Sequence, residues 1–479
     1  MFLMRMISTR DESKEERSYT DVLLAGLAPD GGLYVPSEYP QFSLEELEKL
    51  RRLPYRDIAF AVKKKLVQGD IPDRDLHALI HAAYSETAFG DVASGNIVPL
   101  MKVEDGFYVQ QLSLGPTAAF KDMALLVLAQ EMQYELSRRG EHLTILGATS
   151  GDTGSAAEAA FKGLDRVQLF MLSPENGMSA FQKAQMGSFS GQNIFNVSVR
   201  GRFDDCQDLV KRLKGQKEFS KLGAVNSINW GRISSQVPYF VSGYLQAVRS
   251  VGDPVDFAVS TGNFGNVLSG YIAKRMGVPI RRLVVATNEN DVLDRLFKTG
   301  VYRLSPARVT SSPSMDISKA SNYERLVFDV FGGDSKKTAA YMQEFETNKK
   351  VDLADYGVAV SQLHNLGFES GSSTHADRLE AIRSVYAKAK IVIDPHTADG
   401  VSVGWRCKDV SEDVPMVCMG TALPVKFEDT IKEALGFVPE RPARFVGLED
   451  TLAANAFYSI DADAEQLGKY IREHATERG

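Results

Sequence analysis

Hydrophobic and polar positions follow a repeating pattern through the middle of the chain. Between about residues 97 and 290, short apolar or β-branched runs are each followed by a Gly/Ser/Thr turn and an Ala-rich helical stretch. Residues 143–163 form one such unit, and residues 255–287 contain a strand, a polar glycine turn, a helix and a second strand. These units predict right-handed βαβ crossovers and a buried parallel sheet, so the fold class is α/β.

The flanking regions have different patterns. The N-terminal region mixes turn-rich sequence with helical stretches, and Ser43 and Glu46 have the spacing of a helix-capping box. Residues 291 to about 390 are more polar and helical, and the strand, turn and helix pattern returns from residue 390. We therefore expect a small N-terminal α/β domain at 1–95, a main region of two interleaved α/β lobes at 96–440 and a C-terminal helical extension at 441–479.

Composition and charge narrow the function. The 479 residues are 44% hydrophobic and 24% charged, and a net charge of −7 provides no general basic field for nucleic acid or an anionic membrane. The apolar run at the N-terminus is broken by charges, which argues against a signal peptide or a membrane span. Three scattered cysteines fit neither a disulfide framework nor a zinc site. We expect a cytoplasmic protein that binds neither nucleic acid nor membrane.

The first of three candidate ligand-binding turns is Thr261-Gly262-Asn263-Phe264-Gly265-Asn266, between a strand and a helix. Its glycines allow close backbone approach and positive φ, and the helix N-terminus adds partial positive charge, which suits a phosphate. The turn has no P-loop lysine and no G-x-G-x-x-G spacing, so a nucleotide is disfavoured. A tight turn whose asparagines only cap the helix is an equally good interpretation.

The second turn is Thr149-Ser150-Gly151-Asp152-Thr153-Gly154, in which four of six residues have short hydrogen-bonding side chains. Such a turn can hold a carboxylate through backbone and hydroxyl donors. Helix capping alone needs only one or two of these groups, so we favour a binding role.

The third turn, GPTAAFKD at residues 115–122, leads into an apolar helix. We predict Thr117 as the N-cap, which places Lys121 in the first helical turns. The helix dipole does not favour a cation there, and partial desolvation by Phe120 and Met123 would lower the pKa of its amine. A solvated surface lysine is the alternative interpretation.

Two weaker candidates remain. In NSINWGR, a helix would place Asn229 and Arg232 on one face, and Arg232 either binds an anion or is an ordinary surface arginine. His375 and His396 lie near aspartates but lack short-range ligand spacing, so we expect hydrogen bonds and no metal.

Together, GPTAAFKD, GATSGDTG and TGNFGN, in this order and at these separations, resemble the threonine synthase family, pyridoxal-phosphate enzymes of the tryptophan-synthase β (fold type II) group. The resemblance extends from ISTRD and GLAPDGGLYVP through NSINWGRI and SSPSMDIS to TALPVKF, and so covers nearly the whole chain. It implies two parallel-sheet α/β domains and a small N-terminal α/β domain.

The resemblance also implies roles for individual residues. Lys121 would form the internal Schiff base with pyridoxal 5'-phosphate, Asp152 would lie near the ring hydroxyl, and Thr421 would hydrogen-bond the pyridine nitrogen. The cofactor phosphate would be held by Gly262, Asn263, Phe264, Gly265 and Asn266. The substrate carboxylate would be held by Thr149, Ser150 and Thr153, and the substrate phosphate by Asn226, Ser227 and Arg232.

The implied activity is that of a carbon–oxygen lyase, which converts O-phospho-L-homoserine and water into L-threonine and phosphate through an aldimine, the last step of threonine biosynthesis. The freed Lys121 amine would act as the base at Cα. We expect closure of the small domain over the ligand, because water must be excluded early. A monomer or a homodimer is expected.

Some positions depart from the family pattern. Leu114 and Leu423 replace histidines that many members have, and Asn266 replaces the usual Asp. Two rival functions stay open: a dehydratase or β-replacing synthase of the same fold, and a phospholigand-binding protein without catalysis. The long N-terminal segment and NSIN argue against the first rival, and Lys121 against the second.

Overall fold

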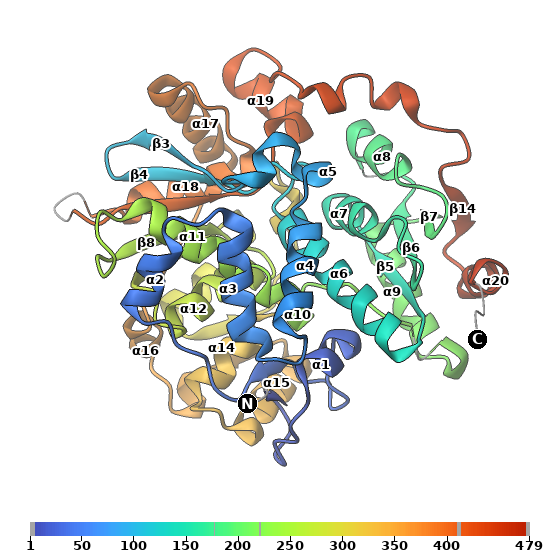
Figure 1. Ribbon diagram of the computed structural model, residues 1–479, viewed down its shortest axis with the longest axis horizontal. Helices are drawn as coiled ribbons and strands as arrows, with labels where there is room; N and C mark the ends of the chain where they lie inside the picture. Colours follow the sequence, from blue (N-terminus) through green and yellow to red (C-terminus); the bar gives the residue numbers. More distant parts are fainter. Residues whose placement is uncertain (1–4, 177, 220–221, 410–412, 476–479) are drawn as a thin grey trace.

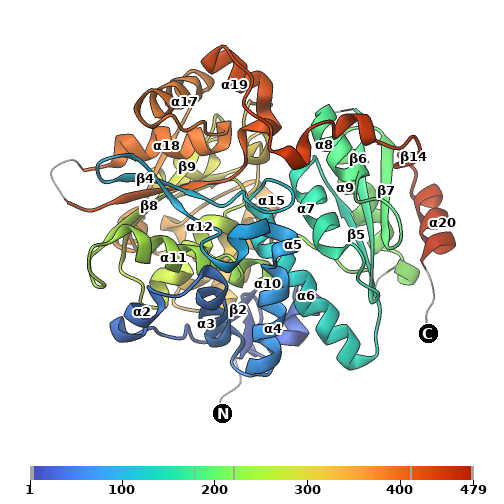
Figure 2. The ribbon, with the colours of Figure 1, turned by 45° about the horizontal axis from the view of Figure 1, so that its top comes forward.

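Two mainly parallel sheets lie side by side in the molecule (Figures 1 and 2). The computed structural model describes residues 5–176, 178–219, 222–409 and 413–475. The α/β fold class is confirmed, as are the strand–turn–helix unit at 143–163 and the strand–helix–strand unit at 255–287. Within the described ranges, none of the helices combines the length and apolar character needed to cross a membrane.

The larger sheet has the strand order β12-β9-β8-β13-β4-β3, and its neighbours are parallel except for the β3–β4 hairpin. Its strands are β3 (Leu100–Glu104), β4 (Phe107–Gln111), β8 (Val255–Ser260), β9 (Ile280–Thr287), β12 (Phe368–Ser372) and β13 (Met416–Gly420). Alternate residues of each strand point to opposite faces. On β8, Phe257 joins the core under α11 (Val237–Ala247) and α12 (Gly265–Arg275), whereas Ala258 joins the core under α17 (His375–Ala389) and α18 (Pro395–Cys407).

The smaller sheet is fully parallel, with the order β14-β7-β6-β5. Its strands are β5 (Leu143–Ala148), β6 (Val167–Pro174), β7 (Ile194–Arg200) and β14 (Tyr458–Asp461), and its helices are α6 (Lys121–Arg139), α7 (Asp152–Phe161), α8 (Ala180–Gly187), α9 (Phe203–Lys214) and α20 (Ala464–His474). The C-terminal region, predicted as a helical extension, contains α20 and also β14, which adds an edge strand to β7.

The N-terminal region is a small α/β unit, as predicted. A two-stranded antiparallel sheet, β1 (Met6–Ser8) and β2 (Tyr34–Pro36), accompanies α1 (Tyr19–Ala25), α2 (Leu44–Leu50), α3 (Tyr55–Val67), α4 (Asp73–Ala83) and α5 (Glu86–Phe89). Ser43 and Glu46 form the predicted capping box of α2. The apolar core of this unit is continuous with that of the larger sheet, and the domain boundaries stay a prediction.

The polar region after residue 291 is largely helical, as predicted. The remaining elements include short 3₁₀-helices, labelled η. They are η1 (Gly90–Ser94), η2 (Lys217–Phe219), α10 (Trp230–Ser234), α13 (Val292–Thr299), β10 (Val301–Arg303), η3 (Pro313–Met315), α14 (Tyr323–Val330), α15 (Ser335–Asn348), β11 (Lys350–Asp352), η4 (Ala354–Tyr356), α16 (Val360–Asn365), η5 (Pro424–Phe427), α19 (Glu428–Leu435), η6 (Ala443–Phe445) and η7 (Glu449–Thr451). The strand expected at 390–394 is absent. Lys390 ends α17 in the left-handed conformation and Asp394 caps α18, so this segment serves two helix termini.

Candidate functional site

Lys121 is the first residue of α6 and is largely buried, with a side chain 12% exposed. Burial lowers the pKa of its amine, although the nearby Asp152 carboxylate acts in the opposite direction. The surface-lysine interpretation is therefore wrong. The prediction that Thr117 is the N-cap is wrong, because Phe120 occupies that position. The Thr117 backbone nitrogen and hydroxyl instead donate to the Asp122 carboxylate, at 2.8 and 2.6 Å.

Asp152 begins α7 and lies between two lysines. Its Oδ2 is 3.5 Å from Lys121 Nζ, and its Oδ1 is 2.6 Å from Lys426 Nζ. Gln182 Nε2 and Ser314 Oγ also donate to this carboxylate, each at 3.2 Å. Burial alone would raise the pKa of Asp152, but Lys426 and Lys121 hold it well below its ordinary value. The carboxylate beside Lys121 is therefore ionised.

Lys426 is a site residue that the sequence interpretation did not assign. Its side chain is fully buried, and its amine also donates to the Thr117 carbonyl at 3.0 Å. The only signal in the sequence was a lysine inside the apolar TALPVKF segment. A lysine is rarely buried without a charged partner, so this position indicated a carboxylate elsewhere in the fold.

The glycine turn precedes α12, as predicted, but its conformation differs from the expectation. Positive φ occurs at Phe264 (64°) and at neither Gly262 nor Gly265. The Phe264 ring lies in an aromatic cluster with Phe297 and Phe368, and this packing offsets the strained backbone. Gly262 allows close approach instead, because a Cβ there would lie 3.2 Å from the Ser314 carbonyl oxygen.

Two buried nitrogens near these turns have no hydrogen-bond partner within the described residues: Asn266 Nδ2 and Arg232 Nε. Asn266 is the second residue of α12, and its Oδ1 accepts from Tyr239 at 2.8 Å. Burial lowers the pKa of Arg232 to about 10, and the Arg232 charge in turn helps to lower the pKa of Lys121. The guanidinium is thus within electrostatic reach of the amine. Buried unpaired donors of this kind fit anionic ligands.

The other residues of NSINWGR are arranged differently from the expectation. Asn229 is the N-cap of α10 and donates to the Leu23 carbonyl at 2.9 Å, so it does not share a helix face with Arg232. Asn226 is exposed, and the Ser227 hydroxyl lies 3.5 Å from Asn322 Nδ2. Asn322 also donates to the Asn263 carbonyl at 3.0 Å, which links this segment to the glycine turn.

In the second turn, Thr149 is buried and its Oγ1 accepts from the backbone nitrogens of Gly151 (3.0 Å) and Gly154 (2.8 Å). The threonine side chain therefore shapes the turn. Ser150 is exposed and Thr153 is half-buried, so both can be reached by a ligand.

Thr421 directly follows β13, and its carbonyl accepts from the Phe120 nitrogen at 2.7 Å, next to Lys121. Its hydroxyl lies 3.4 Å from the hydroxyl of Thr397 and 3.4 Å from Asp394 Oδ1. Leu423, two residues on, packs in an apolar cluster with Ala118 and Phe181. The carbonyl of Leu114 accepts from Arg444 at 3.3 Å.

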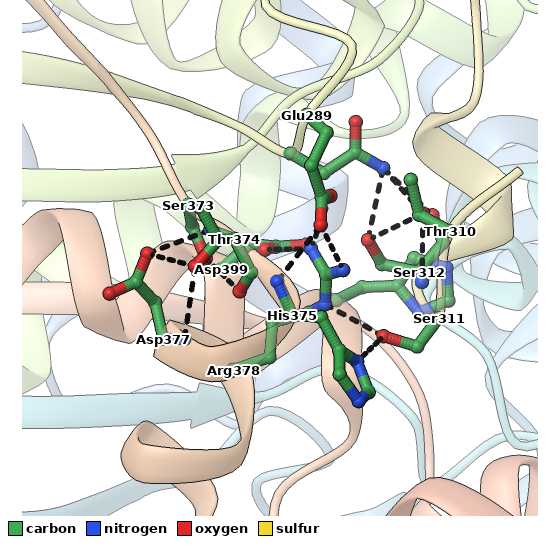
Figure 3. Close-up of polar contacts among 12 residues, drawn as sticks. Glu289, Thr310, Ser311, Ser312, Ser373, Thr374, His375, Asp377, Arg378 and Asp399 are labelled. Carbon is green, nitrogen blue, oxygen red and sulfur yellow. Dashed lines mark hydrogen bonds and ion pairs between the residues drawn. The ribbon is translucent and has the colours of Figure 1, made fainter. Parts of the chain in front are cut away.

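His375 and His396 make hydrogen bonds, as expected. His396 Nδ1 lies 3.0 Å from Asp394, and its Nε2 accepts from the Ser314 nitrogen at 3.0 Å. His375 Nδ1 lies 2.8 Å from the Ser311 hydroxyl (Figure 3). Both histidines therefore hold the loop that carries Ser314 to Asp152.

A buried arginine anchors the same loop. Arg378 pairs with Glu289 at 2.8 Å and with Asp399 at 3.0 Å, and its Nε donates to Ser311 Oγ at 2.8 Å (Figure 3). Glu289 follows β9, and Asp399 lies on α18. The network thus ties the loop to the larger sheet, while Ser314 contacts α7 of the smaller one.

Comparison with known proteins gives full-length matches. Residues 5–84 match the family "Threonine synthase N terminus", residues 92–362 match "Pyridoxal-phosphate dependent enzyme", and residues 397–471 match "Threonine synthase, C-terminal". Threonine synthase of Methylobacillus glycogenes is 48% identical over 98% of this chain and 100% of that protein, and threonine synthase of Corynebacterium glutamicum is 46% identical over 98% of each.

A solved structure agrees with this assignment. The pyridoxal-phosphate-bound threonine synthase of Brucella melitensis superimposes with a TM-score of 0.92 at 39% identity, over 99% of this chain and 100% of that one. The expected fold type II architecture, the cofactor and the activity are all confirmed. The chain belongs to the threonine synthase family of pyridoxal-phosphate-dependent enzymes.

Proposed function

We propose that this enzyme converts O-phospho-L-homoserine and water into L-threonine and phosphate. The observation that carries the proposal is the buried Lys121 amine beside an ionised Asp152, within electrostatic reach of the Arg232 guanidinium, whose Nε has no hydrogen-bond partner among the described residues. This arrangement combines a base of lowered pKa with a binding group for a doubly charged phosphate.

The residues present fit the cofactor. Gly262 leaves backbone space that a Cβ would fill, and Asn266 offers a buried donor without a partner among the described residues. We assign Lys121 to the covalent link, the turn from Gly262 to Asn266 to the phosphate, Asp152 to the ring hydroxyl and Thr421 to the ring nitrogen. When bound, pyridoxal phosphate supplies an electron sink for the carbanion formed at the substrate.

The substrate would be held at both ends. Its carboxylate would be bound by Ser150, Thr153 and the backbone of the turn that Thr149 shapes. Its phosphate would be bound by Arg232, with Ser227 and Asn226 as hydroxyl and amide donors. Two separate anion sites fix the carbon chain between them, so that Cα and Cβ lie near one amine.

Lys121 moves the protons in this scheme. Because burial lowers its pKa, a larger fraction of the amine is neutral near pH 7 and able to remove the Cα proton and then the Cβ proton. Phosphate leaves from Cγ, where Arg232 stabilises its charge. A proton is then delivered to Cγ, water adds its hydroxyl group at Cβ, and Cα regains its proton. The remaining proton of water is taken up by the released phosphate.

The proposal is tested by phosphate release and threonine formation with the Lys121→Ala and Arg232→Ala variants, both loaded with cofactor. Lys121→Ala should lose both products, and borohydride should no longer fix the cofactor to the protein. Arg232→Ala should raise KM for phosphohomoserine at least tenfold while the cofactor stays bound. Threonine formation by Lys121→Ala would refute the assignment of the base. A wild-type enzyme that releases no phosphate from phosphohomoserine but forms a keto acid from serine or threonine would be a dehydratase.

We also propose a cytoplasmic location and a monomeric or homodimeric state. The three cysteines, Cys206, Cys407 and Cys418, are all free, which suits a reducing compartment. Light scattering on the purified enzyme distinguishes the two oligomeric states.

A further inference from the structure

A cluster of metal-ligating side chains lies outside the candidate active site, on two helices of the N-terminal unit. His77 and His81 are four residues apart on α4, so they lie on one face of the helix. Asp57 is in the first turn of the neighbouring helix α3. Each side chain offers one ligand atom, and all of these atoms lie within 4.8 Å of one another.

The two imidazoles are oriented alike. Their rings are stacked with centroids 3.9 Å apart and an interplanar angle of 26°. Phe60, on α3, packs edge-on against the His77 ring at 5.1 Å. These contacts restrain the rings, so both Nε2 atoms face the same carboxylate oxygen. Asp57 Oδ1 is 2.8 Å from His81 Nε2 and 3.8 Å from His77 Nε2.

Only one of the two histidines is hydrogen-bonded to Asp57. His81 is within hydrogen-bond distance of Asp57, whereas 3.8 Å is too long for His77. A tetrahedral zinc ion with ligands at about 2.0–2.2 Å places neighbouring ligand atoms about 3.3–3.6 Å apart. The two distances from Asp57 lie on either side of this range, so changes of about 0.2–0.8 Å would bring both histidines to the spacing of ligands around one ion.

We propose that Asp57, His77 and His81 bind a divalent transition-metal ion, with zinc as the ion that fits the donors. Two imidazole nitrogens and one carboxylate oxygen are donors that zinc prefers, whereas magnesium prefers oxygen ligands alone. The side chains are 30%, 47% and 25% exposed in that order, so an ion can enter and water can complete the coordination. The ion would tie α3 to α4.

The test is calorimetric titration of zinc into the metal-free, cofactor-loaded enzyme and its His77→Gln and His81→Gln variants. The wild type should bind one more zinc ion than either variant, or bind it at least tenfold more tightly, and zinc should raise its Tm more. The matched control is His142→Gln, which removes an exposed histidine elsewhere and should leave the binding unchanged. A tenfold excess of magnesium should not compete.

Equal zinc binding by the wild type and by both histidine variants would overturn the proposal, and so would the absence of zinc binding by the wild type. In both variants, threonine synthase activity without zinc should equal that of the wild type, because the cluster lies outside the candidate active site. This activity also shows that the variants are folded.

Discussion

Asp152 is a buried carboxylate that lies between two buried lysines, and Lys426 makes the shorter of the two contacts. Removing one partner of a buried charge pair leaves the other charge uncompensated. We therefore assign Lys426 a positioning role: it keeps Asp152 ionised and directed toward Lys121. Gln182 donates to one oxygen of this carboxylate and Ser314 to the other.

The Lys426→Met variant should lose at least tenfold in kcat/KM, and Lys426→Arg should recover part of it. In the wild type the pKa of Asp152 is depressed, so its contribution is present at neutral pH and is lost only as the pH falls through the depressed value. Without Lys426 that pKa rises, so the acidic limb of the kcat/KM profile should move to higher pH.

Lys432→Met is the matched control, because it removes an exposed lysine from α19, and it should leave the pH profile unchanged. A uniform loss of activity in Lys426→Met with an unmoved acidic limb would indicate a purely structural role for this lysine.

At the scale of elements, the start of α6 is shaped by Asp122. Its carboxylate binds the Thr117 nitrogen and hydroxyl, and it leaves no room for a Cβ at Gly115, which would lie 2.7 Å from Oδ2. The turn before Lys121 is therefore fixed by the residue after it. Burial raises the pKa of Asp122 to about 6, against an ordinary value of 3.8.

This raised pKa predicts a pH-dependent stability. The folded state binds the Asp122 proton more tightly than the unfolded state, so its contribution is full below pH 3.8 and is lost as the pH rises through about 6. The difference corresponds to at most about 3 kcal/mol, at about 1.4 kcal/mol per pKa unit. Asp122→Asn should therefore gain in Tm relative to the wild type between pH 4.5 and 7.5.

The exposed Asp208→Asn on α9 is the control, and its Tm difference from the wild type should be constant over the same range. A constant difference for Asp122→Asn as well would mean that this carboxyl is ionised in the folded protein at acidic pH.

The sequence predicted those elements whose pattern is local. The buried runs of β8 and the glycine turn before α12 were recognisable because their apolar and turn residues are contiguous. The strand β14 was missed because only Ile460 of its four residues is buried, so it has no apolar run. Positive φ at Phe264 depends on aromatic partners from distant segments, and the burial of Lys426 depends on Asp152. Neither partner is visible in the local sequence.

At the scale of the whole molecule, the C-terminal segment connects the two sheets. It leaves α19 beside the larger sheet, crosses over the molecule and ends at β14 and α20 on the smaller sheet (Figure 1). On the way, Arg444 donates to the carbonyl of Gly115 at 3.0 Å, next to the turn that carries Lys121. Ile460, Leu467 and Ile471 then complete the core under β7 and α9.

Deleting residues 455–479 should destabilise the smaller sheet. Burial of the three apolar side chains contributes about 5–9 kcal/mol, and the deletion also exposes the edge of β7. We expect a lower Tm and soluble aggregates, measured by thermal melting and light scattering. A truncated protein that melts at the temperature of the full chain and stays monodisperse would contradict the prediction.

The position of β13 also matters while the chain is being synthesised. Residues 416–420 lie between β8 and β4, so they join the two halves of the larger sheet. Until these residues emerge from the ribosome, more than 400 residues of nascent chain carry two unpaired strand edges. The larger lobe can therefore reach its native structure only near the end of translation, and a message truncated before this strand leaves the two halves of its sheet unjoined.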